Sequence, residues 1–156
     1  MVEQQIVARG ITEPRVLDAL RAVPRHRFVP AGMQSEAYSD GPLPIGEGQT
    51  ISQPFVVAAM TDALHLQPQD RVYELGTGSG YQGVRGSPLG AHVYTVEIQP
   101  ALAEHAAKTL AELGYTNVSV RSGDGFRGWP EAAPFDAMLI TAAVAELPRE
   151  LLAQLK

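Results

Sequence analysis

The stretch "VYELGTGSGYQGVRGSPLGAHVYTVE", residues 72–97, decides the fold. An apolar run leads directly into Gly76, Gly78 and Gly80. Glycines at this place let the backbone turn sharply and let a ligand approach the main chain closely. A second apolar run follows and ends at Glu97. This order predicts the first two strands of a parallel α/β sheet, with a ligand at the glycine turn.

The connection between these two strands is unusual. A helix is expected to follow the glycine turn, yet the segment 83–89 contains Gly83, Gly86 and Pro88. In a helix interior a glycine costs about 1 kcal/mol and a proline about 3 kcal/mol relative to alanine. We therefore predict that the helix after Gly80 is short, frayed or displaced.

The rest of the second half continues the alternation of strands and helices. Apolar runs at 117–121 and 137–141 read as two more strands, and "PALAEHAAKTLAELG", residues 100–114, reads as a helix that ends at Gly114. The glycines and prolines of 122–135 predict a loop or one short turn. Together these features predict a doubly wound α/β fold with a parallel sheet.

The first half predicts two helices and a long loop. Val16, Leu17, Leu20 and Val23 have helical spacing within 12–23. Residues 29–49 form a loop rich in glycine and proline, with an extended piece at 43–45. A second helix follows, with Ser52 as its expected N-cap and a buried stripe of Phe55, Val56, Ala59, Met60 and Leu64. We expect one domain, residues 1–156, with N-terminal helices and an active-site loop in 1–69 and the sheet in 70–156.

Composition narrows the functional classes. The 156 residues carry a net charge of −5 and no cysteine. Disulfides, thiolate nucleophiles and cysteine-ligated zinc are therefore excluded, and a reducing cytoplasm is the expected location. The acidic balance disfavours nucleic acid as a partner, and no apolar run is long enough to cross a membrane. The four histidines lack the spacing of metal ligands.

The residues at the strand ends favour a nucleoside joined to an amino acid. The glycines follow the pattern G-x-G-x-G, and Tyr81 stands where a dinucleotide fingerprint has its third glycine, which disfavours a pyrophosphate. Glu97 is placed to accept hydrogen bonds from ribose hydroxyls, and Asp124 to hold an adenine amino group. Glu74 would lie near a ligand ammonium. Each feature alone has an ordinary structural alternative, a tight turn or a solvated carboxylate.

The chain resembles the protein-L-isoaspartate O-methyltransferase family. The most specific stretches are "GEGQTISQP", residues 46–54, and "ELGTGSGYQ", residues 74–82. "VPRHRFVP", "VYTVEI" and "NVSVRSGDGFRGWP" extend the match over nearly the whole chain. The resemblance implies a Rossmann-like methyltransferase fold, here without the family's final strands. Four parallel strands would then remain, in the order 3-2-1-4, with residues 137–140 as an apolar edge strand. It also implies the methylation of the α-carboxylate of isoaspartyl residues in damaged proteins and peptides, with S-adenosylmethionine as donor.

The resemblance also implies the site residues. Thr50 and Ser52 match the family's reaction centre, and we expect Ser52 to hydrogen-bond the acceptor carboxylate while the loop 41–52 closes over the cofactor. The matching cofactor positions are Glu74, Gly76, Thr77, Gly78, Ser79, Gly80, Glu97, Ile98, Asp124 and Gly125.

Two readings of the function stay open from sequence. The first is an active protein-repair methyltransferase, and the second is a shortened, non-catalytic domain that binds S-adenosylmethionine weakly or not at all. An oxidoreductase is disfavoured by Tyr81. A nucleic-acid base methyltransferase is disfavoured because "TAAV", residues 141–144, replaces the Asn-Pro-Pro-aromatic motif of many such enzymes. We expect self-association through the edge strand 137–140.

Overall fold

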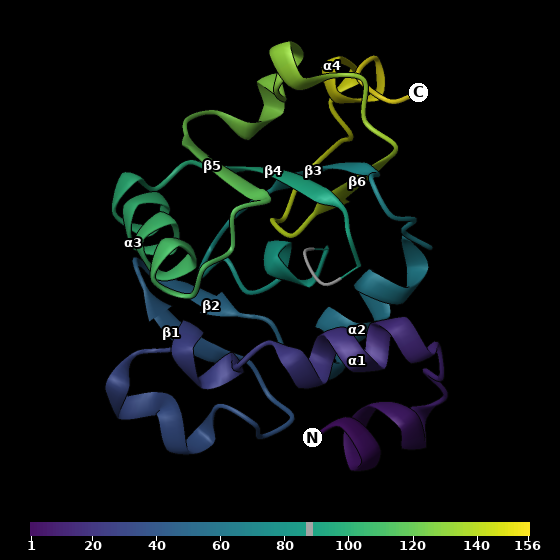
Figure 1. Cartoon of the computed structure of the whole chain (residues 1–156). Helices are drawn as coiled ribbons and strands as arrows, with labels where there is room; N and C mark the ends of the chain where they lie inside the picture. The colour runs from purple at the N-terminus through teal and green to yellow at the C-terminus, as the bar shows by residue number, and fades with distance from the viewer. Residues whose placement is uncertain (87–88) are drawn as a thin grey trace.

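A four-stranded parallel sheet forms the centre of the computed structural model, which describes residues 1–86 and 89–156 (Figure 1). Its strands are β3 (Arg71–Leu75), β4 (His92–Glu97), β5 (Val118–Ser122) and β6 (Ala137–Ile140). They lie in the order β5-β4-β3-β6, and every pairing is parallel. The predicted order 3-2-1-4 is therefore confirmed. In the described sheet β6 has one strand neighbour, β3, and forms an edge.

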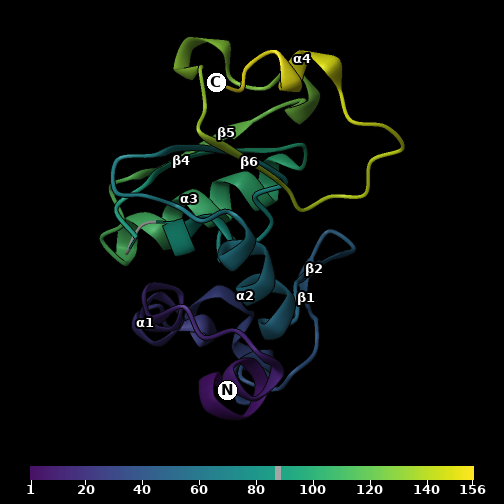
Figure 2. The same ribbon diagram turned by 90° about the vertical axis from the view of Figure 1, so that its right-hand side faces the viewer.

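Both faces of the sheet are covered, as the nearly continuous burial of β3 requires. On one face Tyr73 and Leu75 pack with Phe135 and Leu151. That face lies beneath the segment after β5 and the short helix α4 (Arg149–Leu152), which Figure 2 shows on the side of the C-terminus. On the other face lie α3 (Pro100–Glu112) and the N-terminal part of the chain (Figure 1).

The helix α3 confirms the strongest helical pattern of the sequence. It starts at Pro100, where a first turn tolerates proline, and it is followed by Gly114 at φ +78°. Its buried face brings Leu110 against the glycine turn. A Cβ atom on Gly80 would lie 3.4 Å from Leu110 Cδ1. Gly80 therefore lets the turn and the helix pack closely.

The connection after the glycine turn is short, as predicted. In the described part of this connection the chain forms a 3₁₀ helix, Gly83–Gly86, in place of a full α-helix. Ser87 and Pro88, which belong to the predicted segment 83–89, lie outside the described residues. The two glycines have a packing reason. A Cβ atom on Gly83 would lie 2.6 Å from Glu74 Oε2, and one on Gly86 would lie 2.8 Å from Val93 Cγ2.

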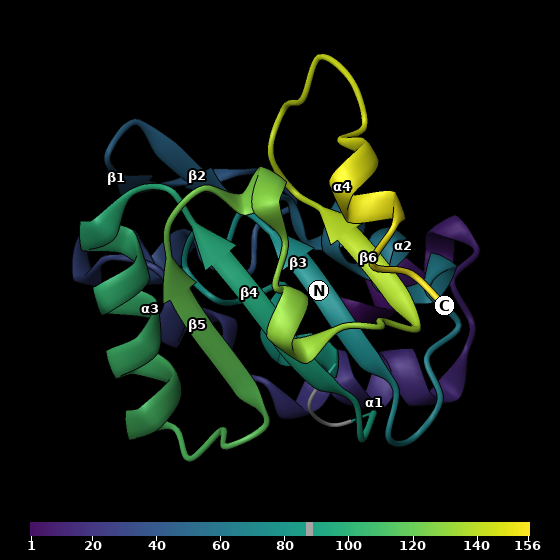
Figure 3. The ribbon, with the colours of Figure 1, turned by 90° about the horizontal axis from the view of Figure 1, so that it is seen from above.

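The N-terminal part contains α1 (Pro14–Ala22), α2 (Pro54–Ala63) and a hairpin of β1 (Leu43–Gly46) and β2 (Gln49–Ile51). A π-helical turn, Val2–Ile6, precedes α1. The predicted extended piece at 43–45 is confirmed as the first strand of the hairpin. Figure 3 shows the arrowheads of the central sheet pointing toward the side on which β1 and β2 lie.

Two predictions about α2 are wrong. The N-cap is Gln53, not Ser52, and it makes no side-chain capping bond. The buried positions are Pro54, Val57, Ala58 and Thr61, while Val56 is 39% exposed. The segment is apolar on nearly all sides, so the periodicity of apolar residues did not identify the face that packs against the rest of the chain.

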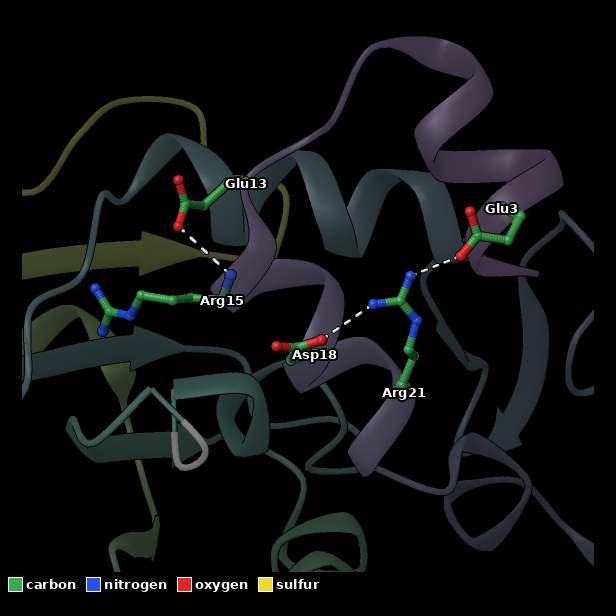
Figure 4. Close-up of polar contacts among 5 residues, drawn as sticks. All are labelled: Glu3, Glu13, Arg15, Asp18 and Arg21. Atoms are coloured by element: carbon green, nitrogen blue, oxygen red, sulfur yellow. Dashed lines mark hydrogen bonds and ion pairs between the residues drawn. The ribbon is translucent and has the colours of Figure 1, made fainter.

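Charged side chains in and beside α1 form polar contacts (Figure 4). Arg21 lies between two acids, with Nη2 2.6 Å from Glu3 Oε1 and Nη1 3.0 Å from Asp18 Oδ1. These pairs are exposed and contribute little to stability. Arg15 contacts residues far away in the sequence. Its Nη1 donates to the Leu66 carbonyl at 3.0 Å and its Nη2 to the Leu89 carbonyl at 3.1 Å.

No helix within 1–86 and 89–156 has the length and apolarity needed to cross a membrane.

Candidate functional site

A cavity of about 500 Å³ lies at the carboxyl ends of the strands, where ligands of open α/β sheets bind. Its walls come from the ends of β3 and β4, from the segments after β5 and β6, and from the residues of β2 that lead into α2. The cavity therefore lies between the sheet and the hairpin side of the N-terminal part, at the edge that the sequence predicts.

The glycine turn after β3 forms one wall. Gly76 and Gly78 have φ angles of +98° and +53°, a region that glycine adopts readily. The space around Gly76 is also tight, because a Cβ atom there would lie 2.7 Å from Thr141 Oγ1. The Thr141 hydroxyl lies 2.9 Å from the Leu75 carbonyl oxygen and 2.6 Å from that of Gly76. Thr141, at the end of β6, thus holds the start of the turn.

Glu97 braces the turn from the end of β4. Its carboxylate is buried, with Oε2 accepting the N–H of Gly78 at 2.8 Å and Oε1 accepting the N–H of Gln99 at 3.0 Å. A carboxylate offers about four lone-pair sites. Two therefore remain for hydroxyl groups of a ligand in the cavity.

Asp124, after β5, shapes the next part of the wall. Its Oδ1 accepts the N–H of Phe126 at 3.0 Å and caps the 3₁₀ helix Gly125–Arg127. Gly125 lies close against β3, because a Cβ atom there would lie 2.8 Å from Leu75 Cγ. Its carbonyl also accepts the Tyr73 hydroxyl at 2.6 Å. The strand and the helix cap fix this acid beside the cavity.

The opposite wall comes from the N-terminal part. Thr50 of β2 and Ser52, which follows it, both line the cavity. The Ser52 carbonyl accepts a hydrogen bond of 2.7 Å from Nη2 of the buried Arg25. The hairpin also reaches the glycine turn, since Ile45 Cδ1 would lie 3.5 Å from a Cβ atom on Gly78.

The charges of the cavity favour a cationic ligand. Glu97 and Asp124 are its two acids, and among the described residues no lysine, arginine or histidine lines it. A pyrophosphate would find no cation on these walls, whereas a sulfonium or ammonium is attracted to them. In the described ranges no group of His, Asp and Glu side chains has the arrangement of a metal site.

Most of the predicted site residues line this one cavity. They are Thr50, Ser52, Gly76, Thr77, Gly78, Ser79, Glu97, Ile98, Asp124 and Gly125. The hydroxyl of Thr77 lies 2.7 Å from that of Thr95.

Glu74 and Gly80 do not belong to the wall of the cavity. Glu74 is fully buried beneath Gly83 on the other face of β3. Burial disfavours its charged form and raises its pKa to about 8. Glu74 thus faces away from the cavity in which we expected a ligand ammonium, and Gly80 packs against α3.

Sequence reasoning missed several wall residues. Phe126, 44% exposed, stands next to the predicted Gly125, and Gln82 and Gln99 also line the cavity. Residues 141–144 come from the end of β6, the fourth strand. The rule that sites gather at the carboxyl ends of parallel strands would have identified 141–144, had it been applied to that strand as well.

Comparison with known proteins gives a consistent result. The family model described as protein-L-isoaspartate(D-aspartate) O-methyltransferase matches residues 1–156. The chain is 55% identical to a protein-L-isoaspartate O-methyltransferase of Opitutus terrae, covering 100% of this chain and 67% of the relative. It is 56% identical to one of a Synechococcus strain, covering 99% and 64%.

Solved structures give the same fold. A protein-L-isoaspartate O-methyltransferase superposes with a TM-score of 0.91 at 30% identity, covering 100% of this chain and 52% of that one. A Plasmodium falciparum structure, described as a putative protein of this kind in complex with S-adenosyl-L-homocysteine, gives a TM-score of 0.80 at 23% identity. It covers 96% of this chain and 76% of that chain.

Proposed function

Because this chain belongs to the protein-L-isoaspartate(D-aspartate) O-methyltransferase family, we propose that it methylates the α-carboxylate of L-isoaspartyl residues in damaged proteins and peptides, with S-adenosylmethionine as methyl donor. The chain spans about two thirds of the length of the curated relatives and about half of the first solved structure. The proposal for this chain therefore rests on its own cavity.

One observation carries the proposal. Glu97 and Asp124, at the ends of adjacent strands, share a cavity with Thr50 and Ser52, and no described cation lines it. The acids suit the ribose and adenine of a nucleoside, and their charge suits a sulfonium. The hydroxyls suit an acceptor that needs hydrogen bonds. Donor and acceptor thus have separate walls that face one space.

In the proposed reaction, the main task of the protein is to align the methyl donor with the acceptor carboxylate. S-adenosylmethionine supplies an electrophilic methyl group on a sulfonium. The acceptor carboxylate is ionised at neutral pH, so no general base is required. One carboxylate oxygen forms the new O–CH₃ bond as the S–CH₃ bond breaks, leaving a neutral thioether. Ser52 would hold the second oxygen, and exclusion of water would keep the two reactants aligned. The backbone amide nitrogen then attacks the ester carbonyl, methanol leaves, and the resulting succinimide hydrolyses in part to normal aspartate.

The two parts of the chain would divide this work within one domain. Residues 70–156 bind the donor, and residues 1–69 supply the acceptor wall. The hairpin lies in the loop 41–52, which we expect to close over the cofactor. We also propose that the protein self-associates through β6 and is cytoplasmic. Neither nucleic acid nor a membrane is proposed as a partner.

The test is the transfer of labelled methyl from S-adenosylmethionine to an isoaspartyl peptide, beside calorimetric titration with S-adenosylhomocysteine. We expect transfer by the unaltered chain. Ser52→Ala should lower turnover by about a hundredfold, because a misplacement of the reacting oxygen by about 1 Å can cost that much, with cofactor affinity unchanged. Ser35→Ala is the control, since Ser35 is exposed and remote from the cavity.

The two measurements separate the possible failures. Unchanged turnover of Ser52→Ala removes Ser52 from the mechanism. If the unaltered chain binds S-adenosylhomocysteine but transfers no methyl, it is the non-catalytic binding domain and the proposed activity is wrong.

A further inference from the structure

Two buried arginines flank Tyr81, a residue of the cavity wall. The guanidinium carbon of Arg25 lies 4.8 Å from the centroid of the Tyr81 ring, and that of Arg85 lies 3.9 Å from it. Their exposed fractions are 0% and 1%. Two cations thus lie directly behind a cavity that no described cation lines.

Within the described residues, Arg25 donates hydrogen bonds to backbone carbonyls and to no carboxylate. Its Nε donates to the Ala37 carbonyl and its Nη2 to the Ser52 carbonyl, each at 2.7 Å. Its Nη1 is buried without a partner in the described part of the chain. Asp40, whose charge acts on Arg25, is itself paired with Arg9 at 2.9 Å.

Among the described residues no carboxylate forms an ion pair with Arg25, so its charge is only partly compensated, by Asp40 at longer range. Arg85 adds to this charge, since Arg85 donates to the Ala19 carbonyl at 2.7 Å and also has no acidic partner in the described ranges. Burial lowers the pKa of Arg25 to about 10, so the guanidinium is still charged at neutral pH.

We propose that Arg25 is a specificity-determining residue, whose charge behind Ser52 selects an acceptor that is an ionised carboxylate. This inference rests on the proposed function and adds the origin of its acceptor preference. Arg25 holds the Ser52 carbonyl, and bond lengths place its guanidinium within about 7 Å of the Ser52 hydroxyl. At that distance, with an effective dielectric constant of about 20, one full charge changes the affinity for an anion by about tenfold or more. The affinity for the acceptor is thus raised by a cation that makes no contact with it.

The experiment compares two peptides that differ in one group. One carries an isoaspartyl residue with its free α-carboxylate, and the other carries the same residue as its α-carboxamide. Binding of each is measured with S-adenosylhomocysteine present. We expect the unaltered chain to prefer the carboxylate, and Arg25→Gln to reduce this preference about tenfold. Arg25→Lys should keep most of this preference, because lysine retains the positive charge although it loses a hydrogen bond to the backbone.

Arg15→Gln is the matched control, because Arg15 also donates two hydrogen bonds to backbone carbonyls but lies away from the cavity. It should leave the preference unchanged. Affinity for S-adenosylhomocysteine should be the same in all variants.

Three results would overturn the inference. The first is an unaltered chain that binds both peptides equally. The second is an Arg25→Gln variant that weakens both peptides by the same factor, which would show support of the backbone alone. The third is an Arg25→Lys variant that folds but has lost the preference, and this variant decides the matter if Arg25→Gln does not fold. Failure of the unaltered chain to bind S-adenosylhomocysteine would instead overturn the proposed function.

Discussion

Oε2 of Glu97 lies 2.8 Å from the backbone nitrogen of Gly78 and accepts its hydrogen bond. The acid that is expected to bind the ribose is therefore also the side chain that holds the glycine turn in shape. Donor binding and the geometry of the turn depend on the same carboxylate.

Replacing this carboxylate by an amide tests its part in ligand binding. Glu97→Gln keeps the size of the side chain but removes its charge and half of its acceptor capacity. Because hydrogen bonds to charged groups contribute about 1.5–3 kcal/mol, we expect S-adenosylhomocysteine to bind about 10-fold to 100-fold more weakly in calorimetry. Glu104→Gln, on the exposed side of α3, should have no effect. Equal affinity of Glu97→Gln and the unaltered chain would exclude Glu97 from the site.

The hydroxyl of Thr141 is the second support of the turn. Thr141→Val keeps the shape but leaves the carbonyls of Leu75 and Gly76 without this donor. We expect the free energy of unfolding to fall by about 1–2 kcal/mol and S-adenosylhomocysteine to bind several-fold more weakly. Thr141→Ser should restore both. Denaturant unfolding and calorimetry measure the two effects, and a Ser variant no better than Val would show that the hydroxyl is not the cause.

Simple patterns in the sequence predicted the parallel sheet and the acids at its edge, whereas the strand order and the full set of site residues came from the resemblance to the family. Apolar runs that alternate with helices define a parallel sheet, and polar residues at its carboxyl ends meet at one edge. The side-chain direction of Glu74 could not be obtained in this way. It stands two residues before Gly76, but it faces the interior beneath Gly83, and proximity along the chain does not reveal that.

The helix α2 shows a second limit. Its apolar residues surround the axis, so the packed face is set by α1 and the cavity rather than by the sequence pattern. The N-cap of α2 shows the same limit. Arg25 holds Ser52 through a hydrogen bond to its carbonyl, and this long-range contact does not follow from the local sequence. By contrast, Gly83, Gly86 and Pro88 predicted a short, frayed or displaced helix from local chemistry, and the described residues form a short one, Gly83–Gly86.

A substitution at Gly83 tests whether close packing against Glu74 is the reason for a glycine at this position. Gly83→Ala would place a Cβ atom 2.6 Å from Glu74 Oε2, so either the side chain or the 3₁₀ helix must shift. We expect the free energy of unfolding to fall by about 1–3 kcal/mol. Gly32→Ala has open space around its new methyl group and no positive φ, so it should be neutral. If Gly83→Ala is stabilising, better helix propensity outweighs the close contact and our explanation is wrong.

Glu74 should make stability fall with rising pH. Burial raises its pKa from 4.5 to about 8, so the folded state binds the proton more tightly than the unfolded state. Below pH 4.5 both states are protonated and there is no penalty. Between pH 4.5 and 8 the unfolded state loses its proton first, and stability declines by at most about 1.4 kcal/mol per pH unit.

Glu74→Gln removes this titration. Its stability relative to the unaltered chain should therefore rise from pH 5 to pH 8, as measured by denaturant unfolding at each pH. A constant difference across this range would show that Glu74 does not retain its proton in the folded protein.

The most direct test of the account is a crystal structure with S-adenosylhomocysteine bound. We predict ribose hydroxyls on the Glu97 carboxylate, adenine beside Asp124, and the sulfur atom facing Thr50 and Ser52. A ligand bound elsewhere, or a cavity that stays empty at saturating ligand, would contradict the claim that this sheet edge binds the methyl donor.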